Sequence, residues 1–211
     1  MGKKYEEKQG QVNRSKKSAP IKDIKDIQKI KQYLSGSGKD CDKMWLCLFI
    51  VGINVGLRTS DLVELRMKDV VDERGKCVSA VSVVEHKTGK DKTFYLNKAA
   101  KDAIKVYLEY RGTVERDGYL FITQKGGPPT VRSVACKLRL LGRELGIKQP
   151  LAAHSLRRTF GYQQYKAHIV SDPGFINTLQ HLFNHSSPSV TLRYIDIDSE
   201  KIQNTYNEVN L

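Results

Sequence analysis

The stretch DKMWLCLFIVGINVGL, residues 42–57, determines how the rest of the chain can be arranged. After its first two residues it is apolar on nearly every side of a helical wheel, which predicts a helix that is buried all round. Such a helix needs other elements on all of its faces, so we expect it at the centre of the domain. Gly56 can adopt the left-handed conformation that commonly ends a helix, and we expect this helix to end there.

Local signals predict the elements on either side of this helix. Upstream, residues 20–34 begin with a proline and carry isoleucines along one stripe, which predicts an amphipathic helix. Downstream, the polar run 59–61 offers caps for a short helix that continues to Leu65. Residues 77–96 are rich in β-branched and aromatic residues around the turn TGKD, which predicts a β-hairpin.

The predicted fold class is α+β, mostly helical with a small antiparallel sheet of three strands at about 69–96. Residues 1–19 carry six Lys and Arg and are expected to form a disordered basic arm. Residues 20–211 have the size of one domain. Further helices are expected at 98–111, 130–146, 155–169 and 173–182, with a short helix from Pro188 and a tail helix near 199–209.

The charge balance indicates the class of partner. The chain of 211 residues has 36 Lys+Arg against 23 Asp+Glu, a formal net charge of +13. Such an excess favours phosphate contacts through counterion release, so a nucleic acid is the expected partner, with a merely soluble basic protein as the alternative. The longest apolar run, residues 44–51, is too short to span a bilayer, and the N-terminus has no apolar stretch of the kind found in signal peptides. We expect a cytoplasmic protein whose cysteines are small buried side chains without zinc spacing: Cys41, Cys47, Cys77 and Cys136.

Three motifs carry cationic side chains that could bind a phosphate. NVGLRTSDL places Arg58 between two packed elements, where its guanidinium could hold a phosphate in a forked manner; a surface arginine at a helix end is the alternative. HSLRRTF places His154 and Arg157 three apart on one helical face, with a solvated basic helix end as the alternative. EHKTGKD puts Lys87 at the hairpin turn, where it could donate a proton, although most turn lysines are simply solvated.

The C-terminal quarter is ambiguous on local grounds. His181 and His185 are four apart and could chelate a metal, but no third ligand is near, so no metal or other cofactor is expected. In SSPSVTLRYI, the pair 187–188 is a natural helix start. Tyr194, near the end of that short helix, is typical of a core tyrosine when it is taken alone.

The order and spacing of the motifs decide between these alternatives. The succession GLRTSDL, HKTGK, HSLRRTF and LFNHSSPSVTLRYI, within residues 20–198, strongly resembles the catalytic domain of the tyrosine recombinases, also called phage-type integrases. The resemblance implies a site-specific DNA recombinase that integrates or excises a mobile element or prophage. The catalytic residues that it implies are two phosphate-clamping arginines, a hairpin lysine, two histidines and a nucleophilic tyrosine: Arg58, Arg157, Lys87, His154, His185 and Tyr194.

In this family the tyrosine attacks a DNA phosphodiester and leaves a 3′-phosphotyrosyl link and a free 5′-hydroxyl. The 5′-hydroxyl of another strand then reverses the step, without ATP or metal. A tyrosine with a pKa near 10 is about one part in a thousand ionised at neutral pH, a handicap of roughly 4 kcal/mol, so a proton acceptor is needed. His154 is the expected acceptor, and Lys87 is the expected acid for the leaving oxygen.

The chain departs from the family pattern in three places. Asn184 stands where glycine usually precedes the second histidine, but asparagine tolerates the left-handed conformation, so we expect the turn to survive. Arg158 follows Arg157 where many relatives have His or Lys. We expect no core-binding domain before residue 20, as in either an excised catalytic domain or a naturally short member, so DNA affinity should be weak and salt-dependent. DNA contacts are expected from Lys90, Lys92, Arg132, Arg158 and Arg193.

The resemblance also implies an assembly. The tail places Ile202, Tyr206 and Val209 on one helical face, and in relatives such a segment packs onto a neighbouring protomer of a tetramer on DNA; packing on its own domain is the alternative. We expect a monomer in solution and a homo-tetramer on DNA. Two other functions stay open: a DNA-binding module or regulator without productive catalysis, and nicking-closing activity of the type IB topoisomerase kind.

Overall fold

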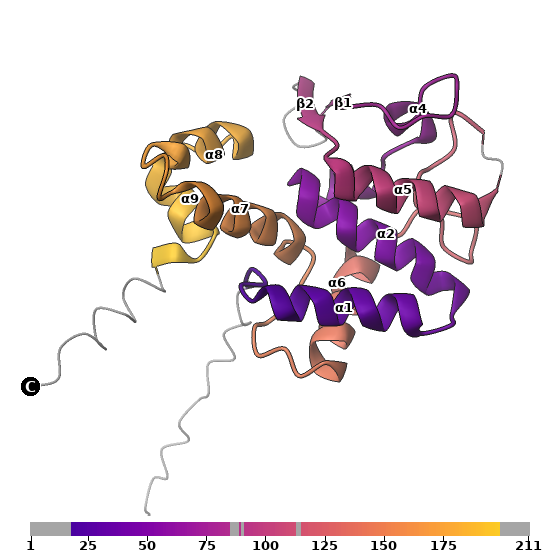
Figure 1. Ribbon diagram of the computed structural model, residues 1–211, viewed down its shortest axis with the longest axis horizontal. Coiled ribbons are helices and arrows are strands. Elements are labelled where there is room, and N and C mark those ends of the chain that lie inside the picture. Colours follow the sequence, from indigo (N-terminus) through magenta and orange to yellow (C-terminus); the bar gives the residue numbers. More distant parts are fainter. Residues whose placement is uncertain (1–17, 85–88, 90, 113–114, 199–211) are drawn as a thin grey trace, which may run out of the picture.

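The computed structural model describes residues 18–84, 89, 91–112 and 115–198. Helix α2 (Asp40–Val55) runs through the larger part of the molecule beside α1 (Ile24–Gly36) and α5 (Lys98–Arg111) (Figure 1). Its buried side chains include Met44, Phe49 and Val55 and recur on several faces of the helix. Gly56 ends it with a left-handed backbone, φ 64°. The predicted central helix and its end are confirmed.

One core cluster holds this larger part together. Besides α1, α2 and α5 it includes residues of three further helices, α3 (Thr59–Val63), α4 (Met67–Val70) and α6 (Val131–Glu144). Ile30, Ile104 and Leu141 come from three different helices and are at most 1% exposed. At the start of α2, the buried Asp42 forms an ion pair with Lys137 of α6. Burial of apolar area from all these elements is the main stabilising term of the domain.

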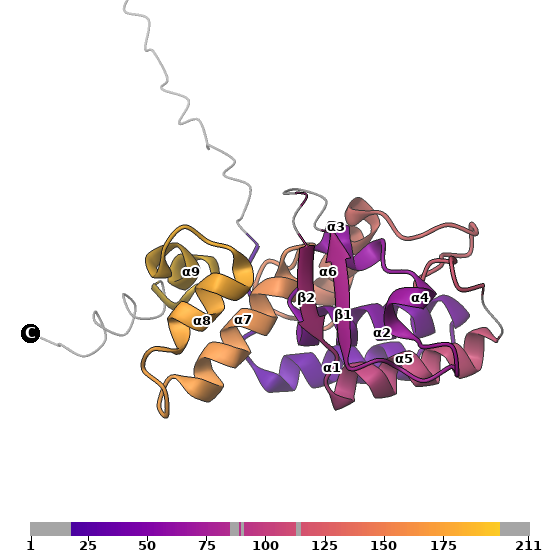
Figure 2. The same cartoon turned by 90° about the horizontal axis from the view of Figure 1, so that it is seen from above.

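The sheet among the described residues is a two-stranded antiparallel hairpin. Strands β1 (Ala80–Val84) and β2 (Asp91–Tyr95) lie side by side in Figure 2, and Val81 and Phe94 pair across them with both side chains buried. The prediction of three strands at about 69–96 is wrong in its strand count among the described residues, because residues 69–79 add no strand to the sheet. That segment makes only an isolated bridge between Val71 and Cys77, because a turn closed by Asp72 folds it back on itself.

Three helices form a second, smaller cluster at one side of the molecule, coloured orange to yellow in Figure 1: α7 (Ser155–His168), α8 (Phe175–Phe183) and α9 (Pro188–Tyr194). Helix α7 joins the two clusters, because Leu156 packs in the larger core and Phe160 in the smaller. The packing is close at two glycines. A Cβ atom on Gly56 would lie 2.5 Å from the Phe160 ring, and one on Gly161 would lie 2.6 Å from the Phe183 ring. Glycine at these positions brings the ends of α2 and α8 against α7.

Helix boundaries agree with the predictions to within a few residues, and two capping details differ. Helix α1 starts at Ile24 rather than near residue 20, because the Asp23 carboxylate caps it by accepting from the Lys25 N–H at 2.8 Å. The prediction that residues 59–61 cap α3 is wrong. The Thr59 hydroxyl donates instead to the Ala153 carbonyl at 2.8 Å, which ties the loop before α7 to the end of α2.

The cysteine prediction holds only in part. Cys47 is buried, Cys41 and Cys77 are partly exposed, and Cys136 lies exposed on α6. Several predictions lie outside the described residues: the arm at 1–17, the hairpin turn with Lys87 and Lys90, and the tail helix at 199–209. In the described part of the chain, every helix is too short or too polar to cross a membrane.

Candidate active site

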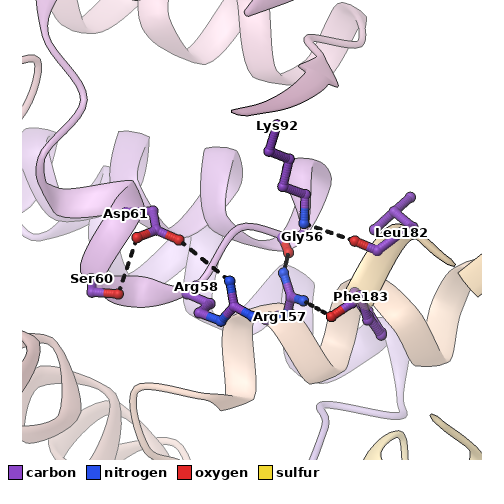
Figure 3. Close-up of polar contacts among 8 residues, drawn as sticks. All are labelled: Gly56, Arg58, Ser60, Asp61, Lys92, Arg157, Leu182 and Phe183. Carbon is purple, nitrogen blue, oxygen red and sulfur yellow. Dashed lines mark hydrogen bonds and ion pairs between the residues drawn. The ribbon is translucent and has the colours of Figure 1, made fainter. Parts of the chain in front are cut away.

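Arg157 lies on α7 where the two cores meet, and its side chain is almost completely buried, with 2% exposure. Its guanidinium donates to the Gly56 carbonyl and, at 3.0 Å, to the Phe183 carbonyl (Figure 3). It also stacks over the Phe183 ring at 4.3 Å. Both carbonyls belong to helix C-terminal ends, which favour a cation. The fork therefore holds the guanidinium in one orientation and ties α2 to α8.

Arg58 lies just after α2, at the base of the same site. Its Nη1 atom is 4.0 Å from an oxygen of Asp61, which is itself buried (Figure 3). Both Arg58 and Arg157 act electrostatically on His185 and Tyr194, so both guanidiniums lie near these two side chains. Two positive charges held this close repel each other, and an anion such as a phosphate would relieve that repulsion.

Tyr194 is the last residue of α9, and its ring is packed among the other site residues. Ring centroids lie 5.5 Å from Phe183 and 4.9 Å from His185, and the Arg158 guanidinium sits 4.8 Å from the ring centre. Burial raises the pKa of Tyr194, against the opposing effect of the nearby arginines. Tyr194 therefore carries its proton at neutral pH and needs a base to become a nucleophile.

His185 follows the turn that ends α8. Asn184 has a left-handed backbone, φ 53° and ψ 48°. The prediction that the turn survives with asparagine in place of glycine is therefore confirmed. The His185 Nδ1 atom lies 3.0 Å from the Thr191 hydroxyl. Burial, followed by the charges of Arg157, Arg58 and Lys92, lowers the pKa of His185 to about 4. The ring is therefore neutral at physiological pH.

Lys92, predicted as a DNA contact, lies beside Arg157 in the structure. Its Nζ atom donates to the Leu182 carbonyl at 2.7 Å, beside the Arg157–Phe183 bond (Figure 3). Lys87, which was predicted as the catalytic lysine of the hairpin, and Lys90 lie outside the described residues. Strand alternation offers a signal for Lys92, because it shares a strand face with the buried Phe94 two residues later and therefore points inward.

The other predicted residues are divided between surface and interior. His154 is exposed at the first position before α7, so the pair with the buried Arg157 does not share one environment. Arg132 and Arg193 are exposed. Arg158 is only 6% exposed, donates to the Ser18 carbonyl and stacks on Tyr194. A DNA contact from Arg158 stays a prediction.

The segment before α1 runs across the back of this site. The Ile21 N–H donates to the Thr159 hydroxyl at 2.8 Å, and Gln163 of α7 donates to the Ile21 carbonyl at 3.1 Å. Lys22 forms an ion pair with Asp196 at 3.0 Å, two residues after Tyr194. The chain entering α1 is thereby joined to the segment that carries the tyrosine.

The chemical groups around Tyr194 are cationic and imidazole side chains. In the part of the chain that the structure describes, no three His, Cys, Asp or Glu side chains gather as metal ligands. A cavity of about 850 Å³ lies elsewhere, lined by Trp45 and Tyr110, and Tyr194 is not part of it. The arrangement is suited to holding an anionic, phosphate-like group beside a tyrosine hydroxyl.

Comparisons with known proteins place the chain among DNA recombinases. The sequence model of the phage integrase family matches residues 22–201. The probable integrase/recombinase YoeC of Bacillus subtilis (strain 168) is 35% identical over 188 residues, 89% of this chain and 94% of that protein. The tyrosine recombinase XerC of Myxococcus xanthus is 28% identical over 162 residues, 74% of this chain and 51% of that protein. The chain thus spans nearly all of one relative and about half of the other.

Solved structures share the fold. The crystal structure of XerA recombinase superposes with a TM-score of 0.66 at 22% identity, covering 91% of this chain and 66% of that one. A lambda integrase(75-356) dimer bound to a COC′ core site gives a TM-score of 0.62 at 19% identity, covering 86% of this chain and 60% of that one. The similarity to these structures confirms the expected α+β, mostly helical architecture of this chain.

Proposed function

The chain belongs to the phage integrase family, the tyrosine recombinases, and from this premise we propose that it cleaves and rejoins double-stranded DNA in site-specific recombination through Tyr194. The observation that supports the proposal most is the convergence on one tyrosine ring of side chains from distant parts of the chain. The ring contacts His185, Phe183 and Arg158, and the positive charges of Arg157 and Arg58 act on its hydroxyl.

In the proposed reaction the Tyr194 oxygen attacks the phosphorus of a DNA phosphodiester. The Oη–P bond forms as the P–O5′ bond breaks, which gives a 3′-phosphotyrosyl link and a free 5′-hydroxyl. Arg58 and Arg157 neutralise the charge that develops on the non-bridging oxygens, an effect worth about 3 kcal/mol for each well-placed donor. Because the bond energy is kept in the covalent link, the 5′-hydroxyl of another strand can reverse the step.

Two protons have to move in this reaction. The Tyr194 proton needs an acceptor, and His154 and His185 are the two candidates in the site motifs. The leaving 5′-oxygen needs a donor, and the hairpin provides Lys87 and Lys92. The position of Lys92 beside the Leu182 carbonyl, close enough to lower the pKa of His185, favours Lys92 as the acid. Comparing Lys92→Ala with Lys87→Ala on a substrate that has a 5′-phosphorothiolate leaving group separates them, because that group needs no acid. The variant that such a substrate rescues has lost the general acid.

We also propose the setting of the reaction. The basic surface of the chain, including the exposed Arg132 and Arg193, would bind double-stranded DNA, with a strong dependence on salt. A homo-tetramer on DNA with exchange of the tail, from a monomer in solution, follows from the family resemblance. The DNA would be that of a mobile element or prophage in the cytoplasm of a bacterial host.

Covalent trapping tests the proposed function. A nicked suicide duplex loses its short 5′-hydroxyl fragment after cleavage, so the protein should remain on the DNA as a denaturant-resistant band at low salt. Tyr194→Phe should abolish that band. Tyr95→Phe, which changes a tyrosine that is 72% exposed on β2, should leave it unchanged.

Three results would count against this function. A retarded complex without any covalent band indicates a DNA-binding module. A band that persists in Tyr194→Phe moves the nucleophile elsewhere. Relaxation of supercoiled DNA without transfer to a second strand indicates a nicking-closing enzyme of the type IB topoisomerase kind.

A further inference from the structure

The Thr191 hydroxyl faces the His185 ring from inside the fold. Thr191 lies on α9, one turn before Tyr194, and is completely buried. Its Oγ1 atom donates to the Ser187 carbonyl at 3.3 Å and lies 3.0 Å from His185 Nδ1. A hydroxyl has one proton, and here that proton is used in the helix. The oxygen therefore meets Nδ1 as an acceptor, which places a hydrogen on Nδ1.

The rest of the surroundings keep the ring in this orientation. The His185 N–H donates to the Gln180 carbonyl at 3.0 Å, and the Gln180 side chain donates to the His185 carbonyl at 3.1 Å. Phe183 packs 5.4 Å from the imidazole and Tyr194 4.9 Å from it. With Nδ1 bonded to Thr191, the other ring nitrogen, Nε2, carries the lone pair of the neutral form.

We propose that Thr191 is a positioning residue that holds His185 as the Nδ1–H tautomer, so that His185 Nε2 is the acceptor of the Tyr194 proton. This inference rests on the proposed function. The proton passes to Nε2 as the Oη–P bond forms and the P–O5′ bond breaks, and it returns to Tyr194 on religation. The leaving 5′-oxygen takes a different proton, from a hairpin lysine.

Burial, followed by nearby positive charge, leaves His185 unprotonated, so its ring is available to accept a proton. Three cations face His185 from other elements: Arg58 after α2, Lys92 on β2 and Arg157 on α7. They keep its ring neutral and thus able to accept a proton in the free protein. A bound phosphodiester brings a negative charge among the same cations, which offsets their effect and raises the basicity of Nε2 when it is needed.

Two variants separate the hydroxyl from the bulk of Thr191. Thr191→Val keeps the shape and removes the hydroxyl, whereas Thr191→Ser keeps the hydroxyl. We expect Thr191→Val to slow formation of the covalent adduct by about 10- to 100-fold, the usual effect of losing a partner that orients a functional imidazole, and Thr191→Ser to stay near the wild-type rate. Thr123→Val is the control, because Thr123 makes a similar hydroxyl-to-carbonyl bond, 3.0 Å to Gly127, away from the site.

A second readout needs no DNA. Nitrogen-15 NMR of histidine-labelled protein at pH 7, with His185→Gln to assign the signal, reports which ring nitrogen carries the hydrogen. The wild type and Thr191→Ser should show the hydrogen on Nδ1, and Thr191→Val should lose that preference. A wild-type Nε2–H tautomer, or an unchanged adduct rate in Thr191→Val, overturns the inference. A wild type that forms no adduct removes the proposed function and the base role together, while the NMR result still decides whether Thr191 positions the ring.

Discussion

Replacing Arg157 by lysine tests whether one buried fork supports both the fold and the chemistry. Lysine keeps the positive charge, but its single ammonium group cannot reproduce the planar fork that now reaches the Gly56 and Phe183 carbonyls. At least one of the two buried carbonyls then loses its partner, which costs about 2 kcal/mol of unfolding free energy. In a chain of this size that corresponds to a fall of roughly 6 °C in the melting temperature.

The same change removes a donor from the developing charge on the phosphate. We expect the rate of adduct formation to fall by about 100- to 1,000-fold, the usual effect of losing one such donor. The rate is measured under single-turnover conditions well below the melting temperature of the variant, which circular dichroism gives for each protein. Arg74→Lys is the matched control, because Arg74 is exposed in the turn closed by Asp72, and it should change neither quantity. If Arg157→Lys melts and cleaves as the wild type does, the role assigned to Arg157 in both fold and chemistry is refuted.

Two further predictions concern packing and pH. Gly161→Ala should lower stability by about 1–3 kcal/mol in a thermal melt, because the new Cβ would lie 2.6 Å from Phe183 and 2.7 Å from Ile195; Gly36→Ala, with nothing within 4 Å, should be harmless, and equal melts for the two would contradict the close packing of α7 on α8. The pKa of His185 is lowered to about 4 from an ordinary 6.5, so the unfolded chain binds the proton more readily than the folded one. The stability that this histidine contributes is therefore complete above about pH 6.5 and is lost as the pH falls toward 4. Chemical denaturation at a series of pH values across that range gives the unfolding free energy as a function of pH. This free energy should depend less steeply on pH in His185→Gln than in the wild type, and an identical pH dependence would mean that His185 titrates normally in the fold.

The sequence predicted those features that depend on local pattern. The apolar stretch around Phe49 can only be a buried helix, and the glycine that ends it and the asparagine before His185 have the left-handed backbones that their chemistry permits. The third strand failed because a turn closed by Asp72 satisfies the backbone locally, and no periodicity in residues 69–79 reveals that competition.

The site was harder to predict, because burial depends on contacts between distant segments. Arg157 and Arg158 are adjacent in sequence and both point inward, one to the ends of α2 and α8 and the other to Ser18 and Tyr194. Nothing in HSLRRTF shows that Arg158 is covered by the segment before α1. Lys92 is similar, since its partner, the Leu182 carbonyl, lies 90 residues away. Only strand alternation with Phe94 gave a local hint of it.

The central claim is that Tyr194 forms the covalent link to DNA, and the most direct test is to identify the linked residue. The adduct trapped on a suicide duplex is digested with nuclease and trypsin and analysed by mass spectrometry. Cleavage after Arg193 and Lys201 gives the peptide YIDIDSEK, in which Tyr194 is the only tyrosine, so the site is unambiguous. We predict a nucleotide 3′-phosphate on that tyrosine. A nucleotide on any other peptide, with this one recovered unmodified, would contradict the account.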